Sequence, residues 1–365
     1  MIFEKIIAEA VKHGASDIHL KIREIPKLRI ATGIINAPGF VKLTEADMYE
    51  TYDYIILGNV ELDTKFRTER NIDVSLEVKG VRLRVNLSNS EGLPILTARI
   101  VKDELPKFEE LGLPEQIREM AYLPQGLILV TGKTNSGKST TLNCIIDDLN
   151  KNTNKKIITL EDPIEYMHKS DKSFIVQKEV GEGKDIRTFS EGVRNSLRED
   201  PDVVVVGEIR DRETIDAAIE IAESGHLVIA TLHTRSCTET IDRIINFYDL
   251  SVQQNIKFLL SSILRLIVSQ RLVPIDINKY VMVPEVMIMN KKIASVIRKP
   301  VYVSAEVEDA IQAAGDGSQT YTDALAKLVL ENKLSLEEAK GQLDERGQDT
   351  LVKTVVQMKR YGNQA

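Results

Sequence analysis

The sequence contains only two cysteines and lacks any long apolar run. Two thiols cannot form a disulfide framework or a four-cysteine zinc site, so we expect Cys144 and Cys237 to be reduced and mostly buried. The longest apolar stretch, residues 258–268, is interrupted by two serines and an arginine, whereas a transmembrane helix needs about 20 apolar residues. No secretory signal is visible at the N-terminus. We therefore expect a cytoplasmic protein with no transmembrane segment, which reaches any membrane through a partner.

An excess of positive charge is also absent, because 48 lysines and arginines face 55 aspartates and glutamates and leave a net charge of −7. This balance excludes a global basic field, although it allows a local basic patch, and we expect no direct nucleic-acid partner. The five histidines lack the spacing of a zinc-binding helix, so no transition-metal site is indicated. The 365 residues, 42% of them hydrophobic and 28% charged, are typical of a soluble globular protein with two or three domains.

The first hundred residues have the pattern of a small α+β domain. Helical spacing alternates with segments in which apolar and polar residues alternate, as in half-buried strands. The predicted elements are helices at 2–11 and 44–57 and strands at 16–22, 71–78, 81–87 and 94–100. Within the strand at 81–87, the alternation places Arg82 and Arg84 on the face opposite the apolar residues. Residues 102–114, which include Pro106 and Pro114, have the character of a linker.

After Pro124, strands alternate with helices, which predicts a mainly parallel sheet in an α/β domain. The strands are continuous apolar runs, as expected where both faces of a sheet are buried. The predicted strands lie at 126–131, 156–160, 203–206 and 226–232, and the predicted helices at 140–149, 189–197 and 213–222. We expect the chain from about residue 251 to be mostly helical. From residue 320 we expect two or three short helices and a polar tail.

The segment 132–139 fits the phosphate-loop pattern Gly-x-x-x-x-Gly-Lys-Ser between a buried strand and a helix. In this context, backbone N–H groups of the loop and of the helix N-terminus converge on phosphate oxygens. We expect Lys138 to bind the β- and γ-phosphates and the Ser139 hydroxyl to ligate Mg²⁺. Gly137 is expected where the backbone approaches the phosphate.

Acidic residues follow two of the predicted strands. Glu208 ends the strand at 203–206, and Glu161, Asp162 and Glu165 follow the strand at 156–160. The carboxyl ends of parallel strands face the ligand crevice, so Glu208 is expected near the phosphates. Pro163 interrupts the second cluster, and we expect its acids to be presented and not buried. An ordinary strand-end acid and a solvated acidic loop are the alternatives.

His233 ends the strand at 226–232, at the same edge as Glu208, where it could sense the γ-phosphate or link subunits. His226 begins this strand and is expected at the far edge, in a packing or hydrogen-bonding role.

Four motifs in this order and spacing resemble those of the secretion and type IV pilus ATPase superfamily. They are a Walker A loop at 132–139, an Asp box at 158–165, an atypical Walker B segment at 206–211 and a His box at 225–234. The resemblance extends from residue 14 to about residue 343. It is strongest to the PilT family of type IV pilus retraction ATPases, which serve twitching motility.

The resemblance implies a PAS-like N-terminal domain (1–101), a linker (102–114), a RecA-like ATPase core (115–290) and a helical C-terminal region with a tail (291–365). It implies a homohexameric ring that binds ATP and Mg²⁺. In such a ring, ATP bound at an interface that two subunits complete converts phosphate chemistry into rigid-body rotation of domains. It also implies a cytoplasmic ATPase at the inner face of the cytoplasmic membrane, held there by an inner-membrane pilus platform protein.

The resemblance further assigns residues to roles. Glu165 is the implied general base or water-positioning acid, Glu208 holds Mg²⁺ through water, and His233 completes the catalytic set. Arginines of the N-terminal domain are implied to reach the nucleotide, although a solvated face is the equal alternative. The residues expected to bind nucleotide are Gly132, Lys133, Thr134, Asn135, Ser136, Gly137, Lys138, Ser139, Thr140, Arg82, Arg84 and Arg99.

Retraction is favoured over pilus assembly because the four-cysteine zinc module and long N-terminal extension of the assembly ATPases are missing. The chain departs from the family at Lys133 and Asn135 in the phosphate loop, and asparagine tolerates a left-handed backbone there. It also departs at residues 292–299, an element linked to retraction, and continues past the usual end after Gly347. The alternatives are an ATPase of another secretion or DNA-uptake machine and an ATP-binding regulator with low turnover.

Overall fold

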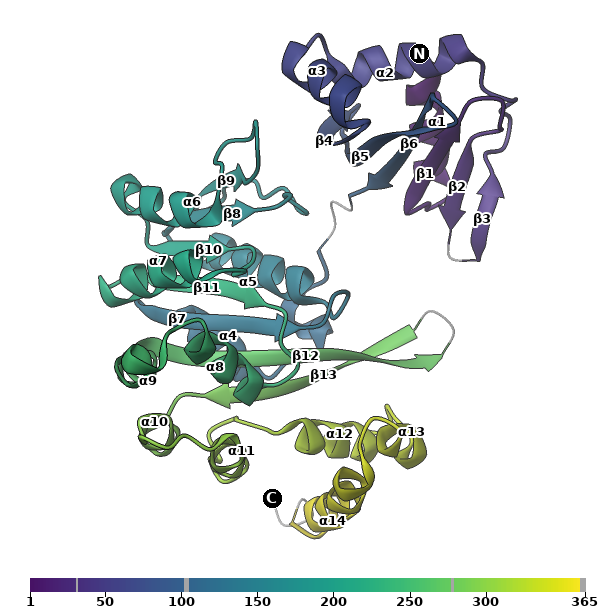
Figure 1. Ribbon diagram of the computed structural model, residues 1–365. Coiled ribbons are helices and arrows are strands. Elements are labelled where there is room, and N and C mark those ends of the chain that lie inside the picture. The colour runs from purple at the N-terminus through teal and green to yellow at the C-terminus, as the bar shows by residue number, and fades with distance from the viewer. Residues whose placement is uncertain (31, 102–104, 277–278, 362–365) are drawn as a thin grey trace. The chain divides into compact units, whose positions relative to one another are not determined.

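The computed structural model describes residues 1–30, 32–101, 105–276 and 279–361. The chain divides into two compact units, Met1–Glu104 and Leu105–Ala365, which are described separately (Figure 1).

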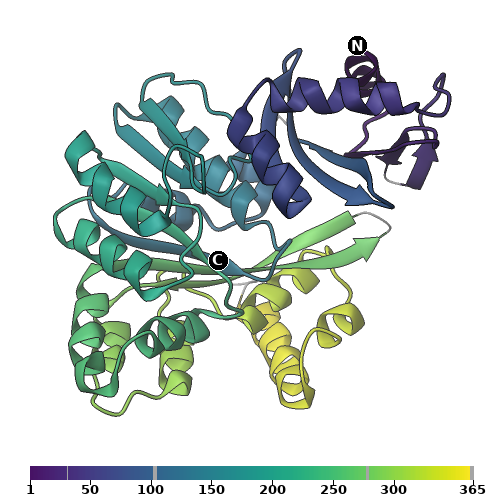
Figure 2. The ribbon, with the colours of Figure 1, turned by 45° about the horizontal axis from the view of Figure 1, so that its top comes forward.

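In its described residues, the N-terminal unit is a six-stranded antiparallel sheet with three helices. Its strands are ordered β3-β2-β1-β6-β5-β4. Figure 2 shows α2 and α3 on this unit. The elements are α1 (Ile2–Lys12), β1 (Asp17–Lys21), β2 (Lys27–Ile30), β3 (Gly33–Asn36), α2 (Glu45–Ile56), α3 (Val60–Glu69), β4 (Asn71–Val78), β5 (Val81–Ser90) and β6 (Leu93–Ile100).

Local sequence explains most of this unit. Thr44 caps α2, and its capping box with Asp47 satisfies backbone donors at the helix start. The predicted alternation in β5 is confirmed, since Leu83 and the apolar residues at every second position are buried. The sequence analysis did not predict β2, β3 and α3, which are short and carry weak periodicity.

The C-terminal unit contains a seven-stranded sheet in the order β13-β12-β7-β11-β10-β8-β9. The strands from β12 to β9 are parallel, and the edge strand β13 is antiparallel to β12. Its strands are β7 (Gly126–Gly132), β8 (Lys156–Glu161), β9 (Phe174–Glu179), β10 (Val203–Val206), β11 (Leu227–Leu232), β12 (Leu264–Asp276) and β13 (Lys279–Ile288).

Helices cover both faces of this sheet. One face packs against α4 and α5, and the other against α6 to α11. The helices are η1 (Phe108–Leu111), α4 (Glu115–Ala121), α5 (Lys138–Asn152), α6 (Phe189–Ser196), η2 (Leu197–Glu199), α7 (Arg212–Glu223), α8 (Cys237–Asn246), α9 (Leu250–Ile263), α10 (Lys291–Ile297), α11 (Ser304–Gln312), α12 (Tyr321–Leu330), α13 (Leu336–Lys340) and α14 (Glu345–Tyr361).

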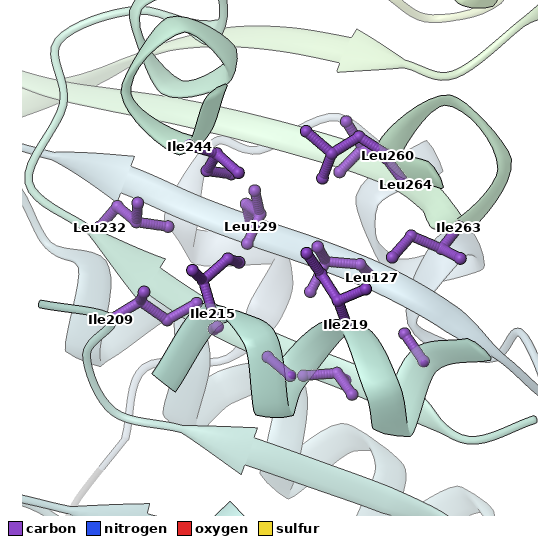
Figure 3. Packing of buried hydrophobic residues seen from close by; sticks show 14 of the residues in the cluster. Leu127, Leu129, Ile209, Ile215, Ile219, Leu232, Ile244, Leu260, Ile263 and Leu264 are labelled. Atoms are coloured by element: carbon purple, nitrogen blue, oxygen red, sulfur yellow. The ribbon is translucent and has the colours of Figure 1, made fainter. Parts of the chain in front are cut away.

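The continuous apolar runs of the central strands follow from this double cover. In β7, Leu127 and Leu129 pack beside Ile215 and Ile219 of α7 (Figure 3), while Ile128 belongs to the core on the opposite face. All four valines of β10 are fully buried, as the sequence pattern predicted. Both cysteines are free and buried, which confirms that prediction.

The prediction that the chain is mostly helical from residue 251 is wrong for the long hairpin of β12 and β13. The first half of β12 lies beside β7 in parallel pairing, and its apolar residues are buried on both sides of the sheet. Leu266 packs on one face and Ile267 on the other, so the apolar run is that of a central strand.

The prediction of a polar tail is also corrected. α14 packs on α12 and contributes Leu351 and Val355 to an apolar cluster with Val273 and Val283 of the hairpin. The segment after Gly347, which runs past the usual end of the family, is therefore helical up to residue 361. Residues 362–365 lie outside the described residues. Within the predicted linker, Phe108 is buried in the core of the C-terminal unit.

Candidate nucleotide-binding site

The carboxyl ends of β7, β8, β10 and β11 meet at one edge of the C-terminal sheet. A cavity of about 430 Å³ lies there. It brings together the predicted residues Thr134, Asn135, Ser136, Gly137, Lys138, Ser139, Thr140, Glu165, Glu208 and His233. Chain segments more than 90 residues apart in sequence therefore share one cavity, as the strand-end argument predicted.

Backbone geometry shows why small or special residues are needed in the loop. A Cβ at Gly132 would collide with the Ser136 hydroxyl oxygen and the carbonyl oxygen of Gln270. Asn135 has a φ of 63°, the left-handed conformation that asparagine tolerates well. Gly137 has a φ of 89° at the N-cap of α5. The loop thus keeps its turn although Lys133 and Asn135 depart from the family pattern.

The Lys138 side chain is buried inside this loop. Its Nζ donates to the carbonyl oxygens of Gly132 at 2.9 Å and Lys133 at 3.0 Å. Burial lowers the pKa of Lys138, and the carboxylates of Glu208 and Glu165 act in the opposite direction. The ammonium is therefore held at the cavity, where two carboxylates favour its charged form.

Two side-chain nitrogen atoms, one from His233 and one from Arg210, contact the Glu208 carboxylate. Its Oε1 lies 3.1 Å from His233 Nε2, and its Oε2 lies 2.7 Å from an Arg210 guanidinium nitrogen. Burial and the nearby Lys138 ammonium lower the pKa of His233, so its imidazole is neutral at pH 7. Arg210 also reaches Asp162 at 3.4 Å. The sequence analysis gave Arg210 no role, although its place two residues after Glu208 was a usable signal.

The acids after β8 divide into an exposed pair and a buried one. Glu165 is exposed, and its Oε1 accepts a hydrogen bond from the Ser139 hydroxyl at 3.2 Å. Asp162 is also exposed. Glu161 is only 6% exposed, so the prediction that all these acids are presented is wrong for this residue. Glu161 is the last residue of β8, where the Thr159 hydroxyl (2.7 Å) and the Gln177 amide (3.0 Å) solvate its carboxylate.

The oxygen atoms around the loop fit Mg²⁺ bound together with phosphates. Ser139 Oγ and the carboxylates of Glu165 and Glu208 line one cavity. Among the described residues, no group of three or more histidine, cysteine or acidic side chains could hold a metal by itself. Mg²⁺ in phosphate-transfer sites needs only one or two protein oxygens beside substrate phosphates and water. The donor set therefore suits a metal that arrives with a nucleotide.

A second cavity of about 720 Å³ adjoins the first within the same unit. The two share Gly137, Thr140 and Leu272 as lining residues. Apolar side chains such as Leu111 and Met282 line the second cavity, together with a few charged groups. A polar hollow thus continues into a more apolar one on the other side of the loop.

The three arginines predicted to bind nucleotide belong to the N-terminal unit. In the sheet register, Arg84 of β5 stands directly opposite Arg99 of β6. Arg82 lies two residues before Arg84 on the same face of β5. Asp17 stands on the other side of Arg99, which donates to it at 2.9 Å. Arg84 and Arg99 are exposed, and like charges in direct opposition destabilise a sheet.

His226 lies at the start of β11, as predicted for the edge away from the cavity. Its Nδ1 hydrogen-bonds the Ser224 hydroxyl at 3.0 Å. No helix in the described ranges combines the length and apolar character that crossing a membrane requires.

Comparisons with known proteins identify the class. Residues 1–300 match the family described as Type II/IV secretion system protein, and the chain belongs to this family.

Among its relatives, the type IV pilus retraction ATPase PilT of Pseudomonas aeruginosa is 37% identical over 345 residues, which are 93% of this chain and 97% of that protein. The crystal structure of the pilus retraction motor PilT with bound ADP superposes with a TM-score of 0.86 at 39% identity, covering 94% of this chain and 97% of that one. The Legionella pneumophila ATPase DotB superposes with a TM-score of 0.76 at 26% identity, covering 96% and 95%.

These matches confirm the predicted fold class, an N-terminal α+β domain followed by a RecA-like ATPase domain with a helical C-terminal region. They also confirm the predicted resemblance to the PilT family.

Proposed function

We propose that this protein is a hexameric ATPase that couples ATP hydrolysis to type IV pilus retraction. The observation that carries the proposal is the cavity at the strand ends, where Lys138, Ser139, Glu165 and Glu208 converge. The similarity to a pilus retraction ATPase over nearly the whole chain supports the direction of action.

The phosphates of ATP bind along residues 132–140, with backbone N–H groups at the start of α5 as donors. Lys138 turns from the loop carbonyls to the β- and γ-phosphates, because its ammonium is attracted more strongly to charged phosphate oxygens than to uncharged carbonyl oxygens. Ser139 supplies its hydroxyl oxygen to Mg²⁺, and Glu208 holds the hydrated ion through water. Bound Mg²⁺ neutralises charge that develops on the phosphate oxygens.

Glu165 orients the water that attacks the γ-phosphorus. Its carboxylate is exposed to the cavity and is held 3.2 Å from the Ser139 hydroxyl, next to the expected phosphate position. His233 contacts Glu208 and lies 3.5 Å from Lys138 Nζ, so it is placed to sense the γ-phosphate. Positioning and charge stabilisation supply most of the catalysis of phosphoryl transfer.

The adenosine moiety occupies the second cavity. Its size falls in the usual range for small-molecule sites, and its apolar lining suits a purine base. Sharing of Gly137 and Thr140 by the two cavities makes one continuous path for base and phosphates.

Arg82, Arg84 and Arg99 complete the site when six chains form a ring. The opposed guanidinium groups of Arg84 and Arg99 gain most from an anion that both can contact. We assign residues 1–101 and 115–290 to the two domains that move relative to each other during the cycle. The ring works in the cytoplasm, on the inner face of the cytoplasmic membrane, against a pilus platform protein.

A second candidate function is an ATPase of another secretion machine. It is favoured by the description of the family, which covers type II and type IV secretion, and by the altered element at residues 292–299. Both candidates require ATP turnover by an assembled ring and differ only in the partner.

The test is steady-state phosphate release by the purified protein, combined with analytical ultracentrifugation in the presence of an ATP analogue. A hexamer that hydrolyses ATP supports both ATPase candidates. Loss of pilus retraction in a strain that lacks the gene, with pili still assembled, selects the first. A strictly monomeric protein with no turnover contradicts both.

A further inference from the structure

The loop that follows β8 carries the exposed Glu165 between two fixed ends. At its start, the buried Glu161 accepts hydrogen bonds from the Thr159 hydroxyl and the Gln177 amide. Burial raises the pKa of Glu161, but these two donors act against that shift and stabilise its carboxylate. Gln177 therefore holds the start of the loop that carries Glu165.

The Gln177 side chain on the edge strand β9 holds the middle of the same loop. Its Nε2 donates to the Tyr166 carbonyl oxygen at 2.8 Å, and its Oε1 accepts from the backbone N–H of His168 at 2.8 Å. One amide thus satisfies backbone groups on two sides of a loop that has no ladder partner of its own.

The His168 ring joins this loop to the phosphate-loop helix. Its Nε2 lies 2.7 Å from Asn143 Oδ1, an atom that can only accept, so the ring carries its proton on Nε2. Asn143 is 1% exposed, and its Nδ2 donates to the carbonyl oxygen of Ser139 at 2.9 Å. Burial lowers the pKa of His168 to about 4, which keeps the ring neutral near pH 7.

These contacts form a closed circuit. Ser139 donates through its hydroxyl to Glu165, and its carbonyl oxygen is held by Asn143, which binds His168 three residues after Glu165. The phosphate loop and the loop after β8, which must meet at the γ-phosphate, are thus connected twice. One connection is the hydrogen bond between Ser139 and Glu165, and the other runs through the buried Asn143 to His168.

We propose that His168, acting through Asn143 and assisted by Gln177, is a positioning residue that fixes the Glu165 carboxylate relative to Ser139. The inference rests on the proposed ATPase function and names a determinant of its rate. Displacement of a catalytic group by about 1 Å can cost about 10²-fold in rate, so a rigid support for an exposed carboxylate has a measurable effect.

The test compares His168→Phe, which keeps a planar ring but removes the donor, with His168→Gln, which restores an amide donor. We expect His168→Phe to lower kcat by roughly 10- to 100-fold while KM for ATP stays within about twofold, since the lost contact acts on the reacting group. His168→Gln should recover most of kcat. Hydrogen exchange at the backbone amides of Glu165 and His168 should be faster in His168→Phe than in the wild type, with or without nucleotide.

Asn150 offers a matched control on the same helix. It is 3% exposed, and its side chain holds the same connection just after His168, through the Lys169 carbonyl oxygen (2.8 Å) and the Asp171 N–H (3.0 Å). We expect Asn150→Leu to lower the melting temperature without changing kcat.

Equal losses of kcat in Asn150→Leu and His168→Phe would overturn the proposal, because a merely structural anchor would then suffice. Wild-type kcat and wild-type amide exchange in a folded His168→Phe would overturn it as well. Absence of turnover in the wild type would instead contradict the ATPase function, while the exchange measurement would still decide whether His168 orders the loop.

Discussion

The two sheets of the chain differ in what they leave exposed. In the N-terminal unit, strands such as β5 alternate, and polar residues including Arg84 stand on an open face. In the C-terminal unit, strands such as β10 are apolar throughout and buried on both faces, and polar groups that line the cavity, such as Glu208, come after the strand ends. The comparison teaches where each unit can place chemistry: along a surface in the first, and at one edge in the second.

The largest effect is expected at the strand-end edge, from Lys138→Ala. Removing the buried ammonium takes away the direct charge on the phosphates, and affinity for an ATP analogue should fall by about 100-fold or more. Calorimetric titration measures it. The control is Lys151→Ala, an exposed lysine at the far end of α5 that pairs only with Asp147 in the described part of the chain. Equal affinity of Lys138→Ala and the wild type would show that this edge does not bind nucleotide.

Glu165→Gln separates chemistry from binding at the same edge. The amide keeps size and hydrogen bonding but removes negative charge, so turnover should fall by roughly 10²-fold or more at near-normal ATP affinity. Glu208→Gln should disturb the Mg²⁺ dependence as well as the rate. Phosphate release across a Mg²⁺ series, with nucleotide binding in parallel, measures both. Wild-type turnover in Glu165→Gln would refute its catalytic role.

The exposed face of the N-terminal unit should respond in turnover and not in stability. Arg84→Ala removes one of two opposed like charges, so the free energy of unfolding should change by less than about 1 kcal/mol. Turnover of the assembled ring should nevertheless drop by about 10-fold, because a guanidinium that contacts phosphate supplies charge stabilisation. Unfolding by denaturant and phosphate release are compared, with exposed Arg29 on the same sheet face as control. Unchanged turnover would leave the face with no role at the nucleotide.

The last prediction concerns the pH dependence of stability and the support behind the strand-end edge. Because burial lowers the pKa of His168 from 6.5 to about 4, the unfolded chain binds the proton more readily than the folded one. Neutral His168 therefore makes its full contribution to the free energy of unfolding above pH 6.5. This contribution, up to about 3 kcal/mol, is lost as the pH falls toward 4. His168→Gln should lose less stability over this window in denaturant titrations. If the free energy of unfolding of the wild type and of His168→Gln falls equally with pH, His168 is not the origin of the pH dependence.

Local patterns predicted much of the C-terminal sheet and most of the site. Residues 127–130 and 203–206 are apolar at every position because helices cover both faces of the sheet, and this pattern is visible in each segment by itself. The glycines and Lys138 of the phosphate loop were likewise visible in their strand–loop–helix context.

The strands β9 and β12 were missed for a different reason. β12 begins with apolar residues at spacings that suit a helix or a strand, and its neighbour β7 lies more than 130 residues earlier. β9 is an edge strand of mixed apolar and polar residues, and only its parallel pairing with β8 marks it as a strand. A short run of apolar or mixed residues has no local feature that favours a strand over a helix. The pairing with strands distant in sequence therefore determines that these two segments are strands.

By itself, the sequence determined the fold class, the phosphate loop and the strand-end positions of Glu165 and Glu208, because periodicity and turn chemistry are local properties. Only the tertiary structure decided that Glu161 is buried beside Glu165, that Arg210 binds Glu208 and that His168 meets Asn143. The contact of His168 with Asn143 joins side chains from different elements, and Gln177 of β9 holds the Glu161 carboxylate. Arg210 and Glu208 lie two residues apart, but only the fold of the loop after β10 brings their side chains together. Such contacts depend on how strands pair and helices pack, which no spacing within a single segment encodes.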